Sequence, residues 1–380
     1  MTGENMVTGL QVERNQDLQR PHYRIAMLAS PSVAMPPAGW DPVGTAVSRI
    51  ADGLMRRGHD VTVFAGAGPL HPTESGGRVQ SVGYQRSNYP LQQWVSDIDH
   101  VVRVFRTIEE SAAQGRPFDL VHDHCDFTAV ALARWLSIPL VHTLHGLITS
   151  QMAALYASYS DCARLVATSD IQLASLPTEL HSVSVIADPV DVRAWPFQPN
   201  KENYLLWVGG FDDLQAAEHA AAAARAAHVP LIINAPVMRG RERYFASHIV
   251  PHLKDDHIRF VGETSGRAQQ RQLISGAKAL LVPAQPGSER NRQLILCSLA
   301  SGTPVIAFQD SGVDDILQDG VNGYLIDDET GLTAAISGVP ALSSASCRAS
   351  VEARFDVETV AVQYERLYRL VISERAALPM

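Results

Sequence analysis

The sequence lacks long apolar runs, cysteine pairs and an excess of positive charge. It contains no stretch of about 18 or more apolar residues, so we expect no membrane-spanning helix. Its first residues show no hydrophobic segment like that of a signal peptide. Cys125, Cys162, Cys297 and Cys347 are far apart and form no CxxC pair, which predicts free thiols in a reducing cytoplasm. The net charge of −9 argues against non-specific binding to nucleic acid.

Signatures of metal sites and of serine hydrolases are also missing. His142 and His145 lie three residues apart, but they fall at the end of an expected strand. They therefore do not share the helix face that a paired metal site needs. No GxSxG motif occurs, so a nucleophilic serine on a strand-to-helix turn is not indicated. We expect no bound metal and no cofactor.

The composition is that of a globular protein with large cores. Hydrophobic residues make up 46% and charged residues 19% of the 380 residues, and this length favours two domains. Apolar segments of strand length alternate with segments of helical periodicity, which is typical of parallel α/β domains. We expect strands at 23–29, 61–65, 118–122, 139–143, 164–168, 182–186, 204–208, 230–234, 258–261, from 281, at 305–308 and at 323–326. We expect helices at 45–57, 97–113, 128–136, 153–159, 214–227, 243–253, 268–276, 294–300, 312–319 and 330–337.

The stretch 281–307, LVPAQPGSERNRQLILCSLASGTPVIA, shows this alternation most clearly. A buried strand leads into a polar loop, and an apolar helix follows over 294–300. Gly302 and Pro304 stop the helix before a second strand, which completes a βαβ unit. The polar loop follows the carboxyl end of its strand, where open α/β sheets bind ligands.

A proline-rich segment without periodicity, 188–200, divides the chain into two similar halves. We predict a flexible extension at 1–21, a Rossmann-like domain at 22–195, a second Rossmann-like domain at 196–355 and a final helix within 356–380. Asp356 is a suitable N-cap for that helix. The predicted fold class is therefore α/β, with two doubly wound parallel-sheet domains and a cleft between them.

Several segments resemble glycosyltransferase family 4, whose members are retaining enzymes of the GT-B fold. The resemblance spans about 23–371. It rests on the segments RRGHDVTVFA, FDLVHDHCDF, LVHTLHG, LASGTPVIAF, GVDDILQDGVNGYLID and RFDVETVAVQYERLY. It implies that the C-terminal domain binds a nucleotide-sugar, that the N-terminal domain binds an acceptor, and that the final helix crosses back to the N-terminal domain. The PP-x-G-W loop and the PFQP linker look closest to a bacterial subgroup that includes orthosomycin-type antibiotic pathways.

The resemblance also implies donor-site residues, and here the sequence departs from the family pattern. Glu289 matches the first of two family glutamates and is expected beside the donor sugar, whereas Cys297 stands in place of the second, which holds the ribose. Gly210 and Gln215 stand where an arginine and a lysine usually clamp the diphosphate. Two nearby cations, Arg290 and Arg292, are candidates to replace this clamp, as are Arg239, Arg241 and Arg243; the alternative is that these arginines form a solvated basic face. Further donor-binding positions are Gly209, Gly262, Gly312 and Val313.

On the acceptor side, His124 matches the family histidine that touches the donor sugar near its 6-hydroxyl. The alternative is a structural histidine bonded to backbone. His145 is a weaker candidate for the cleft. Gly44 remains for close backbone approach, and Trp40 is suited to an acceptor wall or to a structural lid. Ser169 and Asp170, at another strand end, are expected to cap a helix.

These observations predict a retaining glycosyltransferase that moves a sugar from a nucleotide-sugar to a small-molecule or glycan acceptor, in glycan or natural-product biosynthesis. Two alternatives follow from the missing clamp. One is a catalytically silent homologue that acts as a binding or partner protein, and the other is a transferase that uses an unusual donor.

Overall fold

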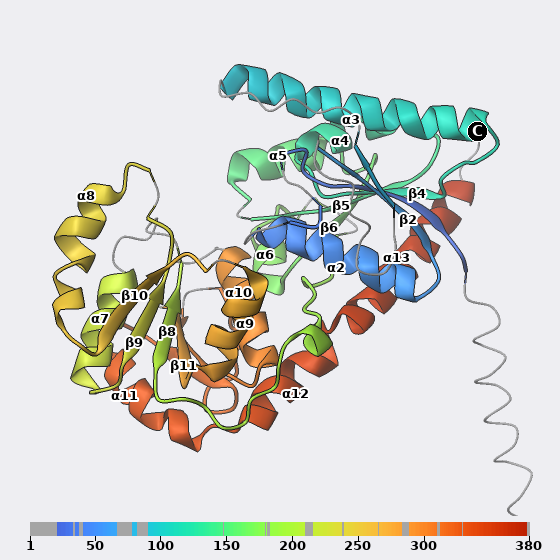
Figure 1. The fold of residues 1–380 in the computed structure, drawn as a ribbon. Coiled ribbons are helices and arrows are strands. Elements are labelled where there is room, and N and C mark those ends of the chain that lie inside the picture. The colour runs from blue at the N-terminus through green and yellow to red at the C-terminus, as the bar shows by residue number, and fades with distance from the viewer. Residues whose placement is uncertain are drawn as a thin grey trace, which may run out of the picture.

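The computed structural model describes most of the chain. The described residues are 21–32, 35–37, 41–66, 78–81, 90–146, 148–178, 180, 183–209, 216–237, 239–264, 266–282, 289–309, 312–328 and 330–377, with backbone only at 90–93 and 289–290. Within them the chain forms two parallel-sheet α/β domains, and the final helix runs from the second domain back to the first (Figure 1).

The N-terminal sheet has seven described strands in the order β3-β2-β1-β4-β5-β6-β7, all of them parallel. Its strands are β1 (Arg24–Leu28), β2 (Asp60–Ala65), β3 (Arg78–Ser81), β4 (Leu120–Asp123), β5 (Leu140–Thr143), β6 (Arg164–Ala167) and β7 (Ser184–Val185). Its helices are α2 (Pro42–Arg56), α3 (Pro90–Ala113), α4 (Phe127–Leu132), α5 (Ser150–Ser158) and α6 (Asp170–Ala174). The short edge strand β3 was not predicted, because it has little apolar character and its side chains are largely accessible.

The two faces of this sheet are buried against different helices. Ile25 and Met27 of β1 point to the side covered by α2 and by the last helix, α13 (Val357–Ala377). Ala26 and Leu28 point to the side covered by α3, α4 and α5. Because successive side chains of a strand face opposite sides, a strand buried on both faces reads as a continuous apolar run. This is why β1 was recognisable from the sequence.

The C-terminal sheet repeats the plan with the strand order β10-β9-β8-β11-β12-β13. Its strands are β8 (Leu205–Val208), β9 (Leu231–Asn234), β10 (Ile258–Gly262), β11 (Ala279–Val282), β12 (Val305–Phe308) and β13 (Gly323–Ile326). Its helices are α7 (Ala216–Ala226), α8 (Glu242–Tyr244), α9 (Arg267–Gly276), α10 (Glu289–Ala300), α11 (Gly331–Gly338) and α12 (Ser344–Phe355). α9, α10 and α12 pack on one face and α7 and α11 on the other. α12 was not predicted, because small polar residues weaken its periodicity.

Two helix predictions were wrong in this domain. The expected helix at 243–253 is broken into α8, a π-helical turn (Phe245–Ile249) and a 3₁₀ turn (His252–Lys254), and Pro251 lies between the two turns. Proline lacks the N–H that a continuing helix requires. The segment expected as a helix at 312–319 forms turns instead, because the Asn322 side chain accepts from the Gln318 amide and donates to the Ile316 carbonyl.

The ends of two predicted helices follow their local sequence signals. α2 begins after Asp41, whose carboxylate accepts from the Gly44 amide, and Gly58 follows its end with a φ of 96°. Asp356 caps α13 by accepting from the Glu358 amide. Its other oxygen accepts from the Val192 amide in the connection between the domains. α13 is part of the N-terminal core, so the last helix packs against the first domain.

Candidate functional site

Each sheet has a point at which the strand order reverses. In the N-terminal sheet it lies between β1 and β4, and in the C-terminal sheet between β8 and β11. Open α/β sheets bind ligands in the crevice outside the carboxyl ends of the strands at such a point. His124 follows β4, Gly209 follows β8, and Glu289 is the first residue of α10, the helix after β11. The structure therefore brings three of the predicted site residues to the two reversal points.

The carboxyl ends of the two sheets face each other. The Arg292 guanidinium, near the start of α10, lies 3.5 Å from the Thr168 carbonyl, which follows β6 of the other domain. The Arg267 guanidinium, at the start of α9, donates to the Pro37 carbonyl in the loop after β1. These contacts join strand-end loops of one domain to helix starts of the other, so a ligand bound there is reached from both domains.

His124 is a buried, neutral histidine with one ring nitrogen committed. Its side chain is 2% exposed, and Nδ1 lies 3.0 Å from Nε2 of His145. Nε2 of His124 has no hydrogen-bond partner among the described residues. Burial lowers the pKa of His124 well below 6.5, and the neighbouring histidines lower it further. His124 and His145, both predicted for the cleft, are thus one hydrogen-bonded pair.

The other histidines nearby have structural partners. Nδ1 of His122 lies 2.6 Å from the Tyr368 hydroxyl of α13, and Nε2 lies 2.9 Å from the Thr143 hydroxyl. Nδ1 of His142 lies 2.5 Å from the Asp123 carboxylate. Both side chains are almost fully buried. They hold the strand ends and the last helix in place.

Gly44 and Trp40 were both predicted for the acceptor side, but the structure describes only Gly44. Gly44 is buried in the first turn of α2, and its N–H is bound by the Asp41 carboxylate. That N–H is therefore already used by the helix cap. Trp40 lies outside the described residues.

Ser169 caps α6 by accepting from the Gln172 amide, so the predicted helix cap at this strand end is confirmed.

The glycines predicted for the donor side have close contacts or backbone conformations that a side chain would disturb. A Cβ on Gly209 would lie 2.7 Å from the indole of Trp207. Gly262 has a φ of 69° and accepts a hydrogen bond from the Asn234 amide group at 2.7 Å. Gly312 has a φ of 74°. Val313 is 1% exposed within the hydrophobic core, so its side chain is not placed to meet a ligand. Gly210 lies outside the described residues.

Arg292 is held by a residue that the sequence did not single out. Its guanidinium makes two contacts of 2.7 Å with the Asp315 carboxylate and donates to the Gly312 carbonyl at 2.9 Å. Its side chain is 10% exposed, so the charge is largely compensated within the protein. This ion pair was missed because Asp315 lies in a turn where a helix was expected.

Cys297 lies inside the domain junction. Its side chain is fully buried, and Sγ is 3.8 Å from the guanidinium of Arg49 on α2. The thiol offers no exposed surface in this structure, and burial raises its pKa. Arg49 was not predicted, and no sequence signal connects it with a position so far along the chain. For Glu289 and Arg290 the structure places the backbone at the start of α10, and their side chains are outside what is described.

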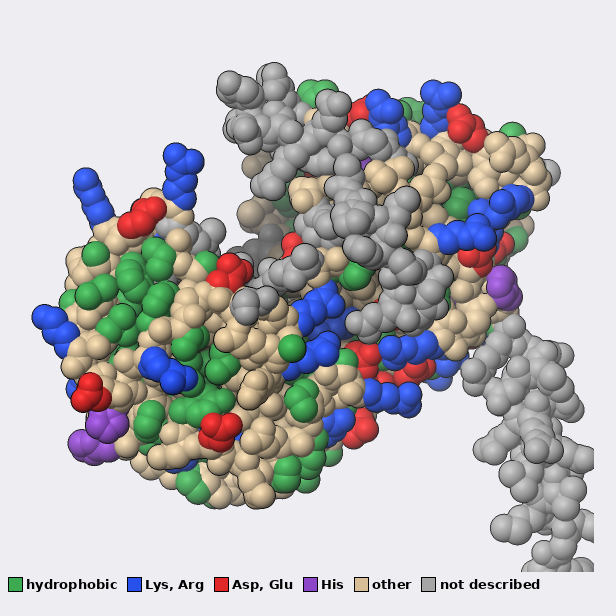
Figure 2. All heavy atoms as spheres, viewed as in Figure 1, with side chains coloured by type: hydrophobic (Ala, Val, Ile, Leu, Met, Phe, Trp, Pro, Cys, Tyr) green, Lys and Arg blue, Asp and Glu red, His purple; other side chains and the backbone are tan. Residues whose placement is uncertain are grey.

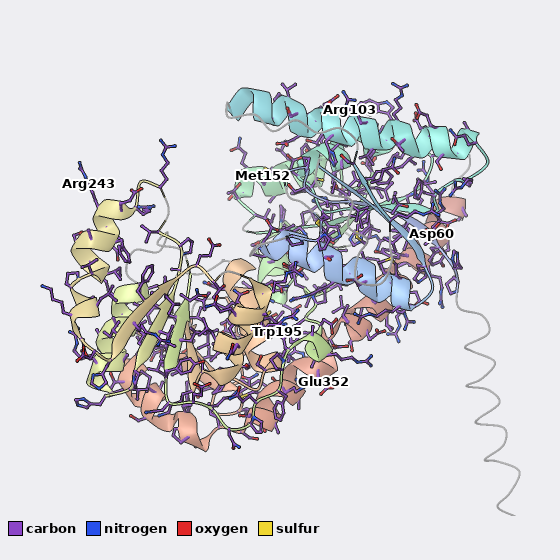
Figure 3. The ribbon with its side chains drawn as sticks, in the orientation of Figure 1. Asp60, Arg103, Met152, Trp195, Arg243 and Glu352 are labelled. Carbon is purple, nitrogen blue, oxygen red and sulfur yellow. The ribbon has the colours of Figure 1, made fainter. Side chains whose placement is uncertain are left out.

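Within the described ranges the chain has neither a metal-binding cluster nor a membrane-spanning helix. No group of three or more His, Cys, Asp or Glu side chains there is arranged to hold a metal ion. None of the described helices is long and apolar enough to cross a membrane. Of the arginines considered as clamp replacements, Arg243 is exposed on α8 at the far end of the C-terminal domain (Figure 3).

Comparisons with known proteins agree with the two-domain arrangement. Residues 43–185 match the model of a glycosyl transferase 4-like domain, and residues 202–339 match that of glycosyl transferases group 1. The D-inositol 3-phosphate glycosyltransferase of Mycolicibacterium smegmatis is 26% identical over 369 residues, covering 82% of this chain and 81% of that protein.

Solved structures share the fold. A sucrose-phosphate synthase from Thermosynechococcus elongatus has a TM-score of 0.74 at 18% identity, covering 93% of this chain and all of that one. A glycosyltransferase involved in avilamycin A biosynthesis has a TM-score of 0.65 at 20% identity, covering 93% of this chain and 98% of that one. Anabaena HepE in complex with UDP has a TM-score of 0.69 at 18% identity, covering 91% and 100%.

Proposed function

Because this chain belongs to glycosyltransferase family 4 and has the GT-B fold, we propose that it transfers a sugar from a nucleotide-sugar to an acceptor with retention of anomeric configuration. The observation that carries the proposal is the position of His124, Gly209 and Glu289 at the reversal points of two sheets whose carboxyl ends face each other. A donor bound to one domain and an acceptor bound to the other would meet there.

In this proposal the donor lies along the start of α10. Backbone N–H groups at a helix N-terminus bind phosphate without a particular side chain, which suits a chain that lacks the usual clamp cations. Gly209 and Gly262 would admit the donor close to the backbone. The Glu289 carboxylate would stabilise the positive charge that develops on the sugar ring. The departing phosphate would accept the proton of the acceptor hydroxyl, so no separate carboxylate base is needed.

His124 would orient the donor sugar. Its imidazole is neutral, and one ring nitrogen is occupied by His145. If His145 donates to Nδ1, the free Nε2 of His124 carries its proton and can donate to a sugar hydroxyl. The acceptor would approach on the side of Gly44, Trp40 and His145. Such a reaction needs no bound metal, so a chelator should leave transfer unchanged.

The relatives suggest which ligands to test first. HepE is described in complex with UDP, and the Mycolicibacterium relative is named for an inositol phosphate acceptor. A further structural relative is involved in avilamycin A biosynthesis. We accordingly propose glycan or natural-product biosynthesis in the cytoplasm as the setting.

The proposal is tested with a panel of UDP, GDP, dTDP, ADP and their sugars. A ligand present at 100 times its dissociation constant should raise the unfolding free energy by about 2.7 kcal/mol, which is visible as a thermal shift. The nucleotide-sugar that binds is then incubated with sugar and inositol phosphate acceptors, and NMR gives the anomeric configuration of the product. Inversion of configuration would contradict the proposed mechanism.

The alternative of a silent homologue is favoured by two observations. Cys297, in place of the ribose-binding acid, is fully buried beside Arg49, and the charge of Arg292 is compensated by Asp315. A silent homologue would show no release of nucleotide from any sugar in the panel. Binding of none of these nucleotides, together with transfer from another activated sugar, would instead indicate an unusual donor.

A further inference from the structure

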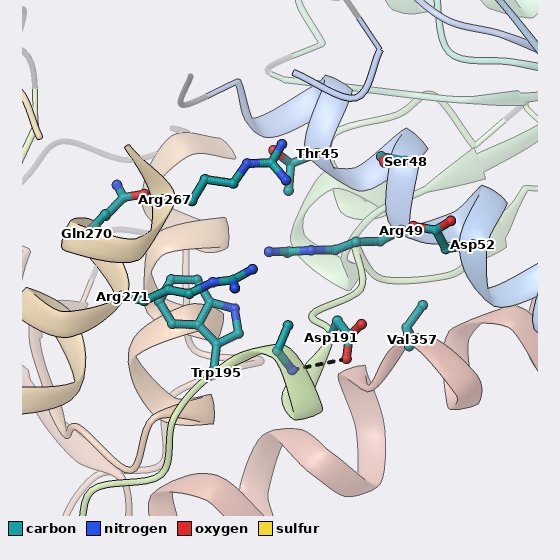
Figure 4. Close-up of a pocket in the computed structure, with 11 residues that line it drawn as sticks. Thr45, Ser48, Arg49, Asp52, Asp191, Trp195, Arg267, Gln270, Arg271 and Val357 are labelled. Carbon is teal, nitrogen blue, oxygen red and sulfur yellow. Dashed lines mark hydrogen bonds between the residues drawn. The ribbon is translucent and has the colours of Figure 1, made fainter. Parts of the chain in front are cut away.

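A small polar pocket lies where the two domains join, next to the connection between them. Its volume is about 60 Å³, well above the roughly 10–15 Å³ that a cavity needs to hold one water molecule. It is lined by α2, by the connecting segment, by α9 and by Val357 at the start of α13 (Figure 4). None of its lining residues is one of the strand-end positions assigned to the donor. Its charged and aromatic lining residues are Arg49, Asp52, Asp191, Trp195, Arg267 and Arg271.

Positive charge predominates in this pocket. Figure 2 shows Lys and Arg side chains gathered where the domains meet. The Arg49 guanidinium donates to the Gln293 side chain at 2.6 Å and to the Pro189 carbonyl at 2.9 Å, both neutral acceptors. Arg271 makes no hydrogen bond or ion pair within the described part of the chain. Its guanidinium lies 5.7 Å from the centre of the Trp195 ring.

Two carboxylates, those of Asp52 and Asp191, also line the pocket, and Asp191 is paired with an arginine outside it. Asp191 pairs with Arg56 at 2.9 Å and accepts from the Ala194 amide, the contact drawn in Figure 4. Asp52 is buried and lies near the same Arg56. Arg49 is held by neutral acceptors and Arg271 has no carboxylate partner among the described residues, so these two guanidinium groups carry the uncompensated charge. Partly buried charge without a counter-ion is costly, so the pocket favours an added anion.

The second observation is an unused hydrogen-bond donor. Trp195 is 4% exposed, and its indole N–H has no partner among the described residues. Buried tryptophan usually finds a partner for this N–H. Figure 4 shows the indole nitrogen on the side of the ring that faces the pocket, beside the Arg271 guanidinium. An indole N–H can only donate, so the missing partner must be an acceptor.

We propose that this pocket binds an oxyanion of phosphate type, separately from the donor site. The Trp195 N–H and the Arg271 guanidinium would both donate to it from the C-terminal side, and Arg49 would reach it from α2 of the N-terminal domain. Guanidinium groups bind phosphate oxygens in pairs, and such charge-assisted hydrogen bonds are the stronger kind. A bound anion would therefore connect the two domains at their junction.

The experiment follows the indole N–H of Trp195 directly. The ¹⁵N-labelled full chain has five tryptophans, and Trp195→Phe identifies the resonance that belongs to Trp195. Sodium phosphate is titrated at constant ionic strength, with sodium chloride as the reference. We expect the Trp195 resonance to shift and saturate with phosphate only. An equal response to chloride, or no response, would overturn the proposal.

Variants test which groups bind the anion. Arg271→Gln removes a half-buried guanidinium with no protein hydrogen bonds, so the fold should be kept, and phosphate binding should weaken by about tenfold or more. Trp195→Phe should also weaken phosphate binding, which calorimetry measures. Arg243→Gln is the matched control, because Arg243 is exposed and far from the pocket (Figure 3). Unchanged binding in Arg271→Gln would contradict the assignment.

A last titration distinguishes free phosphate from the phosphate of a nucleotide. Inorganic phosphate is titrated into protein saturated with UDP, or with whichever panel nucleotide binds. If the pocket is a separate site, the Trp195 resonance responds with the same dissociation constant as before. Displacement of phosphate by the nucleotide would show that the pocket belongs to the donor site, against the proposal. Failure of sugar transfer would not affect this result, since no turnover is measured.

Discussion

The hydroxyl of Tyr368 lies 2.6 Å from Nδ1 of His122, and both groups are fully buried. Tyr368 is on the last helix of the chain, and His122 is on a central strand of the N-terminal sheet. The crossing of the last helix is therefore fixed by a polar contact as well as by apolar packing. The same strand continues to His124, so this contact also supports the candidate site.

Removal of this hydroxyl should destabilise the protein. Tyr368→Phe keeps the ring but leaves a buried ring nitrogen of His122 without its partner, which should cost about 1–3 kcal/mol of unfolding free energy. Urea denaturation measures the loss. Leu370→Ala, at a position 46% exposed on the same helix, is the control and should change stability by less than about 0.5 kcal/mol. Equal effects of the two changes would argue against a role for the hydrogen bond.

Stability should fall as the solution becomes acidic. Burial lowers the pKa of His122 and His124 well below 6.5 and that of His100 to about 4. Below pH 6.5 the unfolded chain binds protons that the folded chain does not, so acid favours unfolding. His100 alone should account for a loss of about 3 kcal/mol between pH 6.5 and pH 4.

The pH prediction is checked by urea denaturation at several values from pH 7 to pH 5. His100→Leu removes one titrating group, so the dependence of unfolding free energy on pH should become less steep by up to about 1.4 kcal/mol per pH unit. The slope is informative even if the substitution changes stability at neutral pH. An unchanged slope would mean that His100 titrates normally in the folded protein.

Removal of the Asp315 carboxylate should lower the unfolding free energy, because Arg292 is partly buried. Asp315→Asn leaves Arg292, only 10% exposed, without its bidentate partner, and should destabilise the protein by about 3 kcal/mol. The double variant Arg292→Met, Asp315→Leu should recover much of this loss, since no charge remains buried. Asp99→Asn, in an exposed pair with Arg103 on α3, should leave the denaturation midpoint unchanged. A mild effect of Asp315→Asn would show that the arginine finds another partner.

Two substitutions should separate chemistry from binding in the proposed transferase. Glu289→Gln keeps the shape but removes the charge that stabilises the sugar cation, and should lower kcat by about 10²–10³-fold with little change in nucleotide affinity. His124→Phe removes a hydrogen bond to the sugar, and should weaken binding of the nucleotide-sugar but not of the nucleotide. Calorimetry and steady-state kinetics measure both. Full activity of Glu289→Gln would remove this residue from the mechanism.

Local signals made much of the site predictable. A residue that directly follows a parallel strand has to lie at one edge of the sheet, so His124 and Gly209 could be placed from periodicity alone. The residues that contact them could not be predicted in this way. His145 belongs to the next strand end, and its contact with His124 depends on the register between β4 and β5. Sequence distance carries no information about such a register.

The sequence by itself determined the alternation of strands and helices and the ends of α2 and α13, because burial on both faces of a strand, capping and glycine turns act within a few residues. Together with the family resemblance it also determined the fold and the crossing of the last helix. Only the tertiary structure decided which charges are paired. Arg292 meets Asp315, Arg49 reaches Cys297, and Arg271 lies beside the unpaired N–H of Trp195. These contacts join segments that are far apart in the sequence, and no local pattern encodes their approach.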